Sequence, residues 1–323
     1  MDQSKTISYV IPLLNEEGSL RPLYDAVTQS TEMLPAGYGD YEIVFIDDGS
    51  NDQSLDILCD LYEQDPEHVR VIQFRRNFGK TAAMTAGFAH ARGDVVVTLD
   101  ADLQDDPREL PKLLDALDAG YDLVVAWRAD RQDPISKRWP SKLANVTVST
   151  LTGIELHDVN CGFKVYRREV LDNLKLYGEL HRYIPVLAHW QGYRVAEVPV
   201  KHHPRKFGQS KFGGGRFLRS YVDFLSVLFL TTYLKRPMHL FGAAGSLFAG
   251  VGMVIMLYLA ILWALEGGIG WRPLLFFGIT AVVVGIQLIS VGLLGEMLRN
   301  ITFRAEEEYS IRQIWEAKEG RDG

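Results

Sequence analysis

Residues 94–107 read DVVVTLDADLQDDP, and the rest of the chain is organised around them. Val95–Leu99 is a short apolar run with β-branched side chains, which is typical of a strand buried on both faces. Asp100 and Asp102 follow directly, with Gln104 after them. Oxygen ligands of this kind suit Mg²⁺ or Mn²⁺, with waters and a diphosphate completing the shell. The stretch therefore predicts a metal site at the rim of a sheet.

An acidic turn that caps the next helix is the alternative reading. Asp106-Pro107 is a good pair for the N-cap and first position of a helix. This reading accounts for Asp106, but Asp100 and Asp102 precede the helix start and need another reason to be crowded together.

Composition narrows the class of protein. The chain has 323 residues, is 47% hydrophobic and carries a formal charge of −7, which argues against a nucleic-acid binder. Cys59 and Cys161 lie far apart without metal-ligand spacing, so a reducing cytoplasmic setting is expected rather than a disulfide framework. The first ten residues, MDQSKTISYV, do not predict a signal peptide.

Strand-like and helix-like segments alternate before residue 215. The pattern predicts strands at 7–12, 41–46, 69–74, 95–99 and 121–126, and helices at 19–34, 52–64, 81–92 and 108–119. Such alternation predicts an α/β fold with a mostly parallel, doubly wound sheet, in which ligands bind at the carboxyl ends of the strands. Polar loops follow four of these strands at 15–17, 47–50, 75–80 and 100–106, so we expect them to converge on one rim.

Two nucleotide-binding motifs are excluded. No G-x-G-x-x-G follows the first strand, so a dinucleotide fingerprint is absent. Gly79-Lys80-Thr81 resembles the end of a P-loop, but Phe74 stands where its first glycine is needed. Lys80 could still meet a phosphate near a helix N-terminus.

Several polar residues beyond residue 126 carry weaker signals. Arg128 stands at the end of a predicted strand, whereas Lys137 and Lys142 are expected on a solvated helical face. His202 and His203 are adjacent on an extended segment and would point to opposite sides, which disfavours a shared metal. The basic loop 203–211 could close over a diphosphate or lie near anionic lipid headgroups.

The C-terminal third has the composition of a membrane segment. Apolar residues at helical spacing over 213–236, with basic residues at both ends, predict an interfacial helix. Uncharged runs at 240–265 and 274–294 are long enough to cross a bilayer, and they predict transmembrane helices at about 240–265 and 274–296. We therefore expect a soluble domain at 1–212, an amphipathic helix at 213–236, two transmembrane helices within 237–299 and a polar tail at 300–323.

Charge near these two helices predicts their orientation. Lys235, Arg236, Arg299 and Arg304 flank the outer ends of the hairpin, against Arg272 alone in its loop. The positive-inside rule then puts the N-terminal domain and both termini in the cytoplasm, in an integral membrane protein of the cell inner membrane or its equivalent.

The motifs IPLLNEE, IDDGS, RRNFGK, TLDADLQDDP and HPRKFGQSK, followed by two membrane helices, resemble the family 2 glycosyltransferases that act on polyprenyl phosphates. That group includes dolichol-phosphate mannose synthases and undecaprenyl-phosphate glucosyl and aminoarabinose transferases. The resemblance implies a GT-A fold, bound Mg²⁺ or Mn²⁺, and inverting transfer of one sugar from a nucleotide sugar to a polyprenyl phosphate such as undecaprenyl or dolichyl phosphate.

The resemblance also assigns roles by motif. Asp100, Asp102 and Gln104 would hold the metal, Arg128 and Arg138 the acceptor phosphate, and Asp102, Asp158 and Arg128 are the catalytic candidates. Residues expected to bind the nucleotide sugar are Pro12, Leu14, Glu16, Asp47, Asp48, Asn77, Gly79, Lys80, Asp100, Ala101, Arg205 and Lys211.

The chain departs from the processive synthases of the same family. Their Gln-x-x-Arg-Trp motif is missing, since Ile135 stands at the glutamine position before Arg138-Trp139, and two helices are too few for a polysaccharide channel. Two alternatives stay open. One is a transferase whose acceptor is another membrane lipid. The other is a membrane-anchored protein that is not an enzyme, such as a nucleotide-binding protein, a scaffold or a small transporter.

The sugar is the least determined feature. UDP-glucose is expected from its frequency in the family, followed by GDP-mannose, UDP-N-acetylhexosamine and UDP-aminoarabinose. The polar tail after Arg304 could reach a neighbouring subunit in a homo-oligomer.

The predicted orientation can be tested by cysteine labelling. A cysteine at Gly268 should react with an impermeant reagent added from the periplasmic or luminal side, because the hairpin loop would face that side. Cysteines at Ser4 or Asp322 should stay unlabelled in sealed cells, and the reverse pattern would overturn the charge argument.

Overall fold

The computed structural model describes residues 4–128, 156–158, 161–174, 176, 178, 180–201, 203, 237–267 and 273–302. The chain forms two compact units, Met1–Asp223 and Phe224–Gly323. The predicted interfacial helix at 213–236 and the polar tail beyond residue 302 lie outside the described residues.

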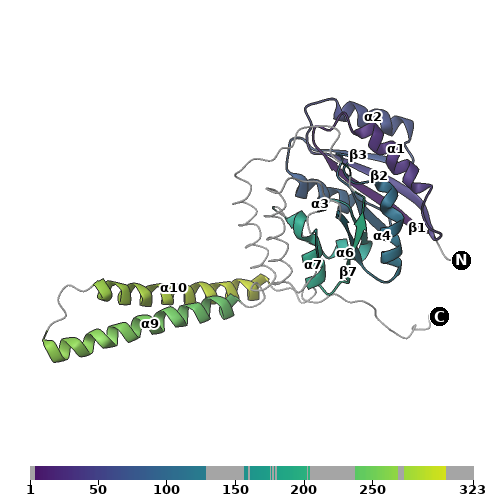
Figure 1. The fold of residues 1–323 in the computed structure, drawn as a ribbon. Helices are drawn as coiled ribbons and strands as arrows, with labels where there is room; N and C mark the ends of the chain where they lie inside the picture. The colour runs from purple at the N-terminus through teal and green to yellow at the C-terminus, as the bar shows by residue number, and fades with distance from the viewer. Residues whose placement is uncertain are drawn as a thin grey trace, which may run out of the picture. The chain divides into compact units, whose positions relative to one another are not determined.

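A seven-stranded mixed sheet is the centre of the first unit (Figure 1). Its spatial order is β3-β2-β1-β4-β6-β5-β7. The strands are β1 (Lys5–Leu13), β2 (Tyr38–Asp47), β3 (Val69–Gln73), β4 (Val95–Thr98), β5 (Leu123–Arg128), β6 (Lys164–Arg167) and β7 (Val195–Val200). Every pairing is parallel except the two that β6 makes with β4 and β5.

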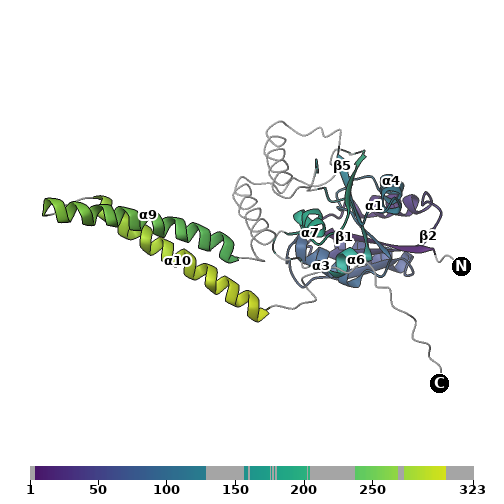
Figure 2. The ribbon, with the colours of Figure 1, turned by 90° about the horizontal axis from the view of Figure 1, so that it is seen from below.

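Helices cover both faces of this sheet. They are α1 (Leu20–Thr31), α2 (Ser54–Gln64), α3 (Lys80–His90), α4 (Leu110–Asp118), α6 (Arg168–Asp172) and α7 (Ile184–Trp190), with short 3₁₀ turns η1 (Pro107–Glu109) and η2 (Leu180–Tyr183). Figures 1 and 2 show α1 and α4 on one side of the sheet and α3 and α7 on the other. The turn η1 begins at Pro107, and Asp106 accepts a hydrogen bond from the Arg108 N–H at 3.1 Å, so the predicted cap is confirmed.

The core explains why the central strands read as continuous apolar runs. Ile7, Tyr9, Val10 and Ile11 of β1 are fully buried, because helices cover both faces of the strand. Each such side chain contributes about 1.5–3 kcal/mol by leaving water. Gly87 lets α3 approach closely, since a Cβ there would lie 2.4 Å from Val10 Cγ1.

The sheet extends further than the sequence pattern indicated. The residues Phe163–Tyr166 have the composition of a strand, but they do not reveal that β6 runs antiparallel to its neighbours. The sequence of β7 lacks the regular apolar and polar alternation that would predict a strand. As a result, the residues just before β6 lie at the same rim as the carboxyl ends of the parallel strands.

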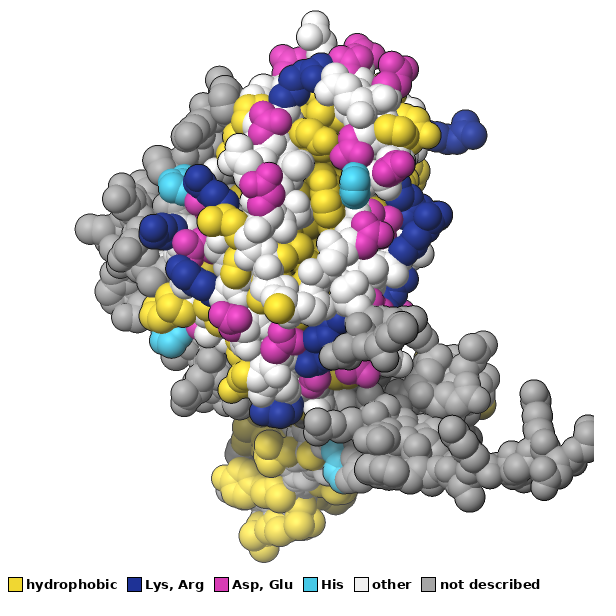
Figure 3. Space-filling model, turned by 90° about the vertical axis from the view of Figure 1, so that its right-hand side faces the viewer, with side chains coloured by type: hydrophobic (Ala, Val, Ile, Leu, Met, Phe, Trp, Pro, Cys, Tyr) yellow, Lys and Arg dark blue, Asp and Glu magenta, His cyan; other side chains and the backbone are white. Residues whose placement is uncertain are grey.

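The second unit contains two long apolar helices, α9 (Pro237–Glu266) and α10 (Pro273–Thr302). Their segments Met238–Leu265 and Pro273–Leu298 are long and apolar enough to cross a membrane. Most of their large side chains are exposed, as expected of surfaces that face lipid. In Figure 3, by contrast, the described surface of the first unit carries acidic and basic side chains mixed together.

Glycines set the close packing of α9 on α10. A Cβ on Gly285 would lie 2.5 Å from the Ala249 backbone nitrogen, and one on Gly252 would lie 2.7 Å from the Gly278 carbonyl oxygen. Small residues at such crossings let helix backbones approach in a membrane, where van der Waals packing replaces the hydrophobic effect between helices. The two apolar helices therefore form a packed hairpin.

Replacement of Gly285 by leucine should loosen this hairpin. The new side chain must push the helices apart, at a cost of about 1–3 kcal/mol for overpacking. The detergent-solubilised full-length variant should melt at a lower temperature than the parent. Gly250→Leu is the matched control, because no atom lies within 4 Å of a Cβ at that position on α9. Equal melting temperatures for the two variants would contradict the packing described here.

Candidate active site

The polar loops predicted to converge do lie at one rim of the sheet. Leu13 at the end of β1 is aligned with Asp47 of β2, which is aligned with Gln73 of β3. Thr98 pairs with Val10 on β1, so the aspartates that follow β4 extend toward the same edge. The carboxyl ends of four parallel strands therefore surround one site.

The aspartate pair after β2 joins the loop that follows β2 to the loop that follows β3. Asp48 is buried and accepts hydrogen bonds from the backbone N–H groups of Phe78 and Gly79, at 2.7 and 2.9 Å. Asp47 is fully buried and accepts one from the Ser50 N–H at 2.9 Å. Its Oδ2 atom has no hydrogen-bond partner within the described parts of the chain. The loop therefore offers a buried acceptor at the rim.

Asp100 lies between two lysines. The Lys80 ammonium, at the start of α3, donates to Asp100 Oδ1. The Lys164 ammonium lies in the buried interior and donates to the Cys161 carbonyl oxygen. Between them, the backbone of Gly162 lies against the carboxylate, and a Cβ there would sit 2.5 Å from Asp100 Cγ. The turn before β6 thus packs directly against the Asp100 carboxylate.

Charge and burial together set the ionisation of this cluster. Burial by itself would raise the pKa of Asp100, but the neighbouring charges of Lys80, Lys164 and Arg128 lower that pKa below its ordinary value. Burial lowers the pKa of Lys164 to about 8. Burial, with Lys80 nearby, lowers the pKa of His181 to about 3. Asp100 is consequently anionic and His181 neutral at physiological pH.

The second aspartate is held in a tight turn. Asp102 is buried, and its Oδ1 accepts a hydrogen bond from the Gln104 N–H at 3.1 Å. Leu103 between them adopts a φ of 59°, the left-handed region that non-glycine residues rarely occupy. The Gln104 carbonyl oxygen accepts from the His203 N–H at 2.9 Å. This strained turn fixes where the Asp102 carboxylate lies.

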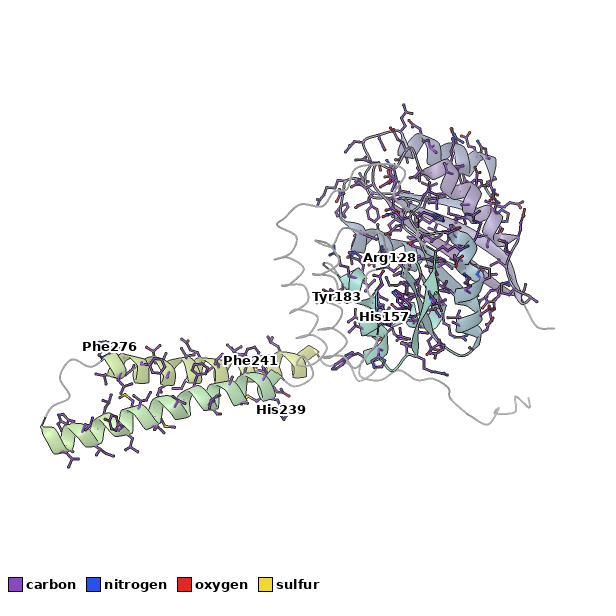
Figure 4. All side chains as sticks on the ribbon, viewed as in Figure 1. Arg128, His157, Tyr183, His239, Phe241 and Phe276 are labelled. Carbon is purple, nitrogen blue, oxygen red and sulfur yellow. The ribbon has the colours of Figure 1, made fainter. Side chains whose placement is uncertain are left out.

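Arg128 and Asp158 form a bidentate ion pair. Figure 4 labels Arg128 and also His157, the residue that precedes Asp158. Arg128 at the end of β5 donates through Nε and Nη2 to the two Asp158 oxygens, at 2.6 and 3.0 Å. Burial would lower the pKa of Arg128, but the Asp158 carboxylate raises it. Glu197 on β7 accepts from the backbone N–H groups of His157 and Asp158. Asp158 is buried, Arg128 is partly buried, and Glu197 of β7 holds the backbone at Asp158 in place.

Apart from Arg128 and Asp158, the predicted site residues fall into three groups. The structure brings together Asp47, Asp48, Gly79, Lys80, Asp100, Ala101, Asp102 and Gln104 around the ends of β2, α3 and β4. Pro12, Leu14 and Glu16 lie at the end of β1 and are half-buried, and Asn77 is exposed in the loop before α3. Arg138, Arg205 and Lys211 lie outside the described residues.

Sequence reasoning missed four contributors: Gly162, Lys164, His181 and Glu197. The first two lie in the segment 158–164, which as a bare pattern is weak. His181 sits in η2, where its Nδ1 lies 2.6 Å from the Thr81 hydroxyl on α3. Glu197 precedes Pro199 on an edge strand with little periodicity. Only the tertiary fold brings these residues to the rim.

Comparison with known proteins gives a consistent result at three levels. A family model described as Glycosyl transferase family 2 matches residues 8–175. Among solved structures, glucosyl-3-phosphoglycerate synthase from Mycobacterium tuberculosis, in complex with Mn²⁺, uridine-diphosphate-glucose and phosphoglyceric acid, superposes with a TM-score of 0.53. The match covers 69% of this chain and 80% of that one at 22% identity, and it supports the fold alone. The expected GT-A fold is confirmed.

Two kinds of curated relative extend over nearly the whole chain. The dodecaprenyl-phosphate galacturonate synthase of Rhizobium johnstonii is 37% identical over 321 residues, covering 97% of this chain and 94% of that protein. The undecaprenyl-phosphate 4-deoxy-4-formamido-L-arabinose transferase of Klebsiella pneumoniae is 36% identical over 320 residues, covering 96% and 94%. The resemblance found from the motifs is confirmed: the chain belongs to glycosyl transferase family 2, in the group that contains these polyprenyl-phosphate transferases.

Proposed function

We propose that this protein transfers one sugar, with inversion, from a nucleotide sugar to a polyprenyl phosphate at the cytoplasmic face of a membrane. The observation that carries the proposal is the Asp100–Asp102 pair at the end of β4, enclosed by the loops after β2 and β3. Full-length similarity to enzymes named for polyprenyl-phosphate acceptors supports it. The apolar helices α9 and α10 would keep the enzyme where such a lipid resides.

The loop after β2 is suited to bind the nucleoside. Asp47 Oδ2 is a buried acceptor that lacks a partner among the described residues, and a base or ribose can supply a donor to it. Leaving such an atom unsatisfied costs about 1–3 kcal/mol, so a ligand that pairs with it gains affinity. Asp48 has a structural role instead, because both of its carboxylate oxygens accept hydrogen bonds from the loop that leads into α3.

The residues after β4 fit a divalent metal. Among the described residues, no three His, Cys, Asp or Glu side chains form a ready-made metal cluster. Mg²⁺ and Mn²⁺ sites that act on diphosphates need only one or two protein carboxylates, since phosphate oxygens and waters complete the shell. Asp100 and Asp102 would provide them, with Gln104 beside them. A bound metal would stabilise charge on the leaving diphosphate.

Arg128 is the candidate for the acceptor phosphate. That phosphate is already ionised at neutral pH, so the enzyme needs to position it rather than remove a proton. Asp158 binds both the Nε and the Nη2 of Arg128. We therefore assign Asp158 to orienting the guanidinium, because a carboxylate engaged in a bidentate pair is a poor general base.

The sugar expected from family frequency needs to be reconsidered. Glucosyl transfer appears in the names of structural neighbours whose identity of 20–22% supports the fold alone. Relatives at 34–37% identity are named for galacturonate and 4-deoxy-4-formamido-L-arabinose. We therefore place nucleotide-linked galacturonate and formamido-arabinose first among the donors to test, ahead of UDP-glucose, GDP-mannose and UDP-N-acetylhexosamine.

A transfer assay tests the proposal directly. The purified full-length protein should move radiolabel from one of these nucleotide sugars to undecaprenyl phosphate in the presence of Mn²⁺. Asp102→Asn should lower the rate by about two orders of magnitude or more, as is typical when one preorganised electrostatic group is lost. Unchanged rates in EDTA would rule out the metal, and label transfer to diacylglycerol instead would identify a different lipid acceptor.

Substitution of Arg128 tests the acceptor assignment. Arg128→Ala should raise the apparent KM for polyprenyl phosphate at least tenfold, since a hydrogen bond to a charged group contributes about 1.5–3 kcal/mol. Nucleotide affinity, measured by calorimetry, should change little. Arg128→Lys should restore part of the loss, because the charge remains but the planar fork does not.

A control for folding is needed because the pair is buried. Removal of Arg128 alone leaves the buried Asp158 uncompensated, which can cost about 3–5 kcal/mol in stability. The double variant Arg128→Gln/Asp158→Asn removes both charges and should fold normally while keeping the raised KM. Loss of nucleotide affinity in that double variant, with lipid dependence intact, would overturn the assignment.

A further inference from the structure

Lys80 and Lys164 are two ammonium groups near one carboxylate, but they differ in their freedom to move. The Lys80 side chain is 38% exposed and extends from the first residue of α3 to Asp100 Oδ1. Lys164 is 3% exposed and fixed to the Cys161 carbonyl oxygen. Solvent can reach the Lys80 ammonium, so a rotation of its side chain disturbs no packed core. Lys164 has no such freedom.

The Asp100 carboxylate has little room of its own. Gly162 packs against it from below, with its Cα so close that even one added methyl group would overlap the carboxylate. Gly162 therefore blocks one side of the Asp100 carboxylate, and the side chain remains 35% exposed on the others. A cation that binds Asp100 there meets the positive charge of Lys80, which already contacts Oδ1.

We propose that Lys80 is an exchangeable counter-ion of Asp100: it holds the position of a divalent cation until the nucleotide sugar arrives, and then moves to the diphosphate. This inference rests on the proposed function, in which Asp100 is a metal ligand. It adds an order of events to that function. Lys164 stays beneath the site throughout and keeps a positive charge near Asp100 when Lys80 leaves.

Electrostatics supplies the reason for this exchange. A divalent cation and an ammonium beside the same carboxylate repel each other, and in a partly buried site this repulsion is stronger than in water. Without a diphosphate, a metal at Asp100 competes with Lys80 for the carboxylate, and an ammonium that moves away has no anionic oxygen to receive it. With a diphosphate bound, both cations have anionic oxygens to contact. Metal and nucleotide binding are therefore coupled, and the coupling acts equally in both directions.

The test measures Mn²⁺ binding in the absence of nucleotide, by electron paramagnetic resonance of free Mn²⁺ with the full-length protein in detergent. Lys80→Met removes the charge but keeps the length of the side chain. This variant should bind Mn²⁺ about tenfold more tightly than the parent without nucleotide, equivalent to about 1.4 kcal/mol. The enhancement of Mn²⁺ affinity by UDP should shrink by a similar factor. A gain in affinity cannot result from misfolding.

Three further variants make the result specific. Lys80→Arg keeps the charge and should retain the weak nucleotide-free affinity of the parent. Lys5→Met is the matched control, because Lys5 is 40% exposed and paired with Asp118 at 2.7 Å, at the opposite end of β1. It should leave Mn²⁺ binding unchanged. In an Asp100→Asn background, Lys80→Met should no longer raise the affinity, because the carboxylate for which the two cations compete is gone.

The outcomes separate this inference from the function beneath it. If UDP promotes Mn²⁺ binding to the parent but Lys80→Met leaves nucleotide-free affinity the same or weaker, the exchange is wrong while the metal site stands. If the parent binds no Mn²⁺ with or without UDP, both the metal site and the exchange are wrong. A gain in Lys5→Met equal to that in Lys80→Met would reduce the effect to net charge and overturn the exchange as well.

Discussion

The contact between Asp100 and Gly162 connects the two parts of the sheet on which the site depends. Asp100 follows β4, the last of the four adjacent parallel strands formed by the first hundred residues, whereas Gly162 precedes the antiparallel strand β6. The Thr98 hydroxyl donates to the Gly162 carbonyl oxygen at 2.8 Å, and Lys164 donates to the carbonyl of Cys161. Backbone from a distant part of the chain is thereby fixed in place and packs against one side of the carboxylate.

Much of the first unit could be read from the sequence because buried parallel strands leave a strong signal. Val95–Leu99 is apolar on both faces and ends in carboxylates, and the structure places this run as expected. The same rule located β1 and β2. The polar loops that follow them could be assigned to one rim because parallel strands end at the same edge.

The remainder of the site depends on contacts that no local pattern encodes. The direction of β6 is set by its pairing with β4 and β5, not by its four residues. His181 reaches α3 across a separation of 100 residues, and Glu197 braces Asp158 across 39. The left-handed conformation of Leu103 was not predictable either, since leucine has no local preference for it. Residues that pack or brace are thus harder to predict than residues that end a strand.

The reversed strand β6 has a consequence for how such a protein can diversify. Because β6 is antiparallel to β4 and β5, the segment that precedes it lies at the rim formed by the loops that follow the parallel strands. The described groups proposed for the nucleotide lie within residues 12–104, and the described groups proposed for the lipid phosphate, Arg128 and Asp158, come later in the chain. Substitutions in one portion of the rim can therefore change its ligand independently only where they spare the contact between Gly162 and Asp100, at which the two portions meet.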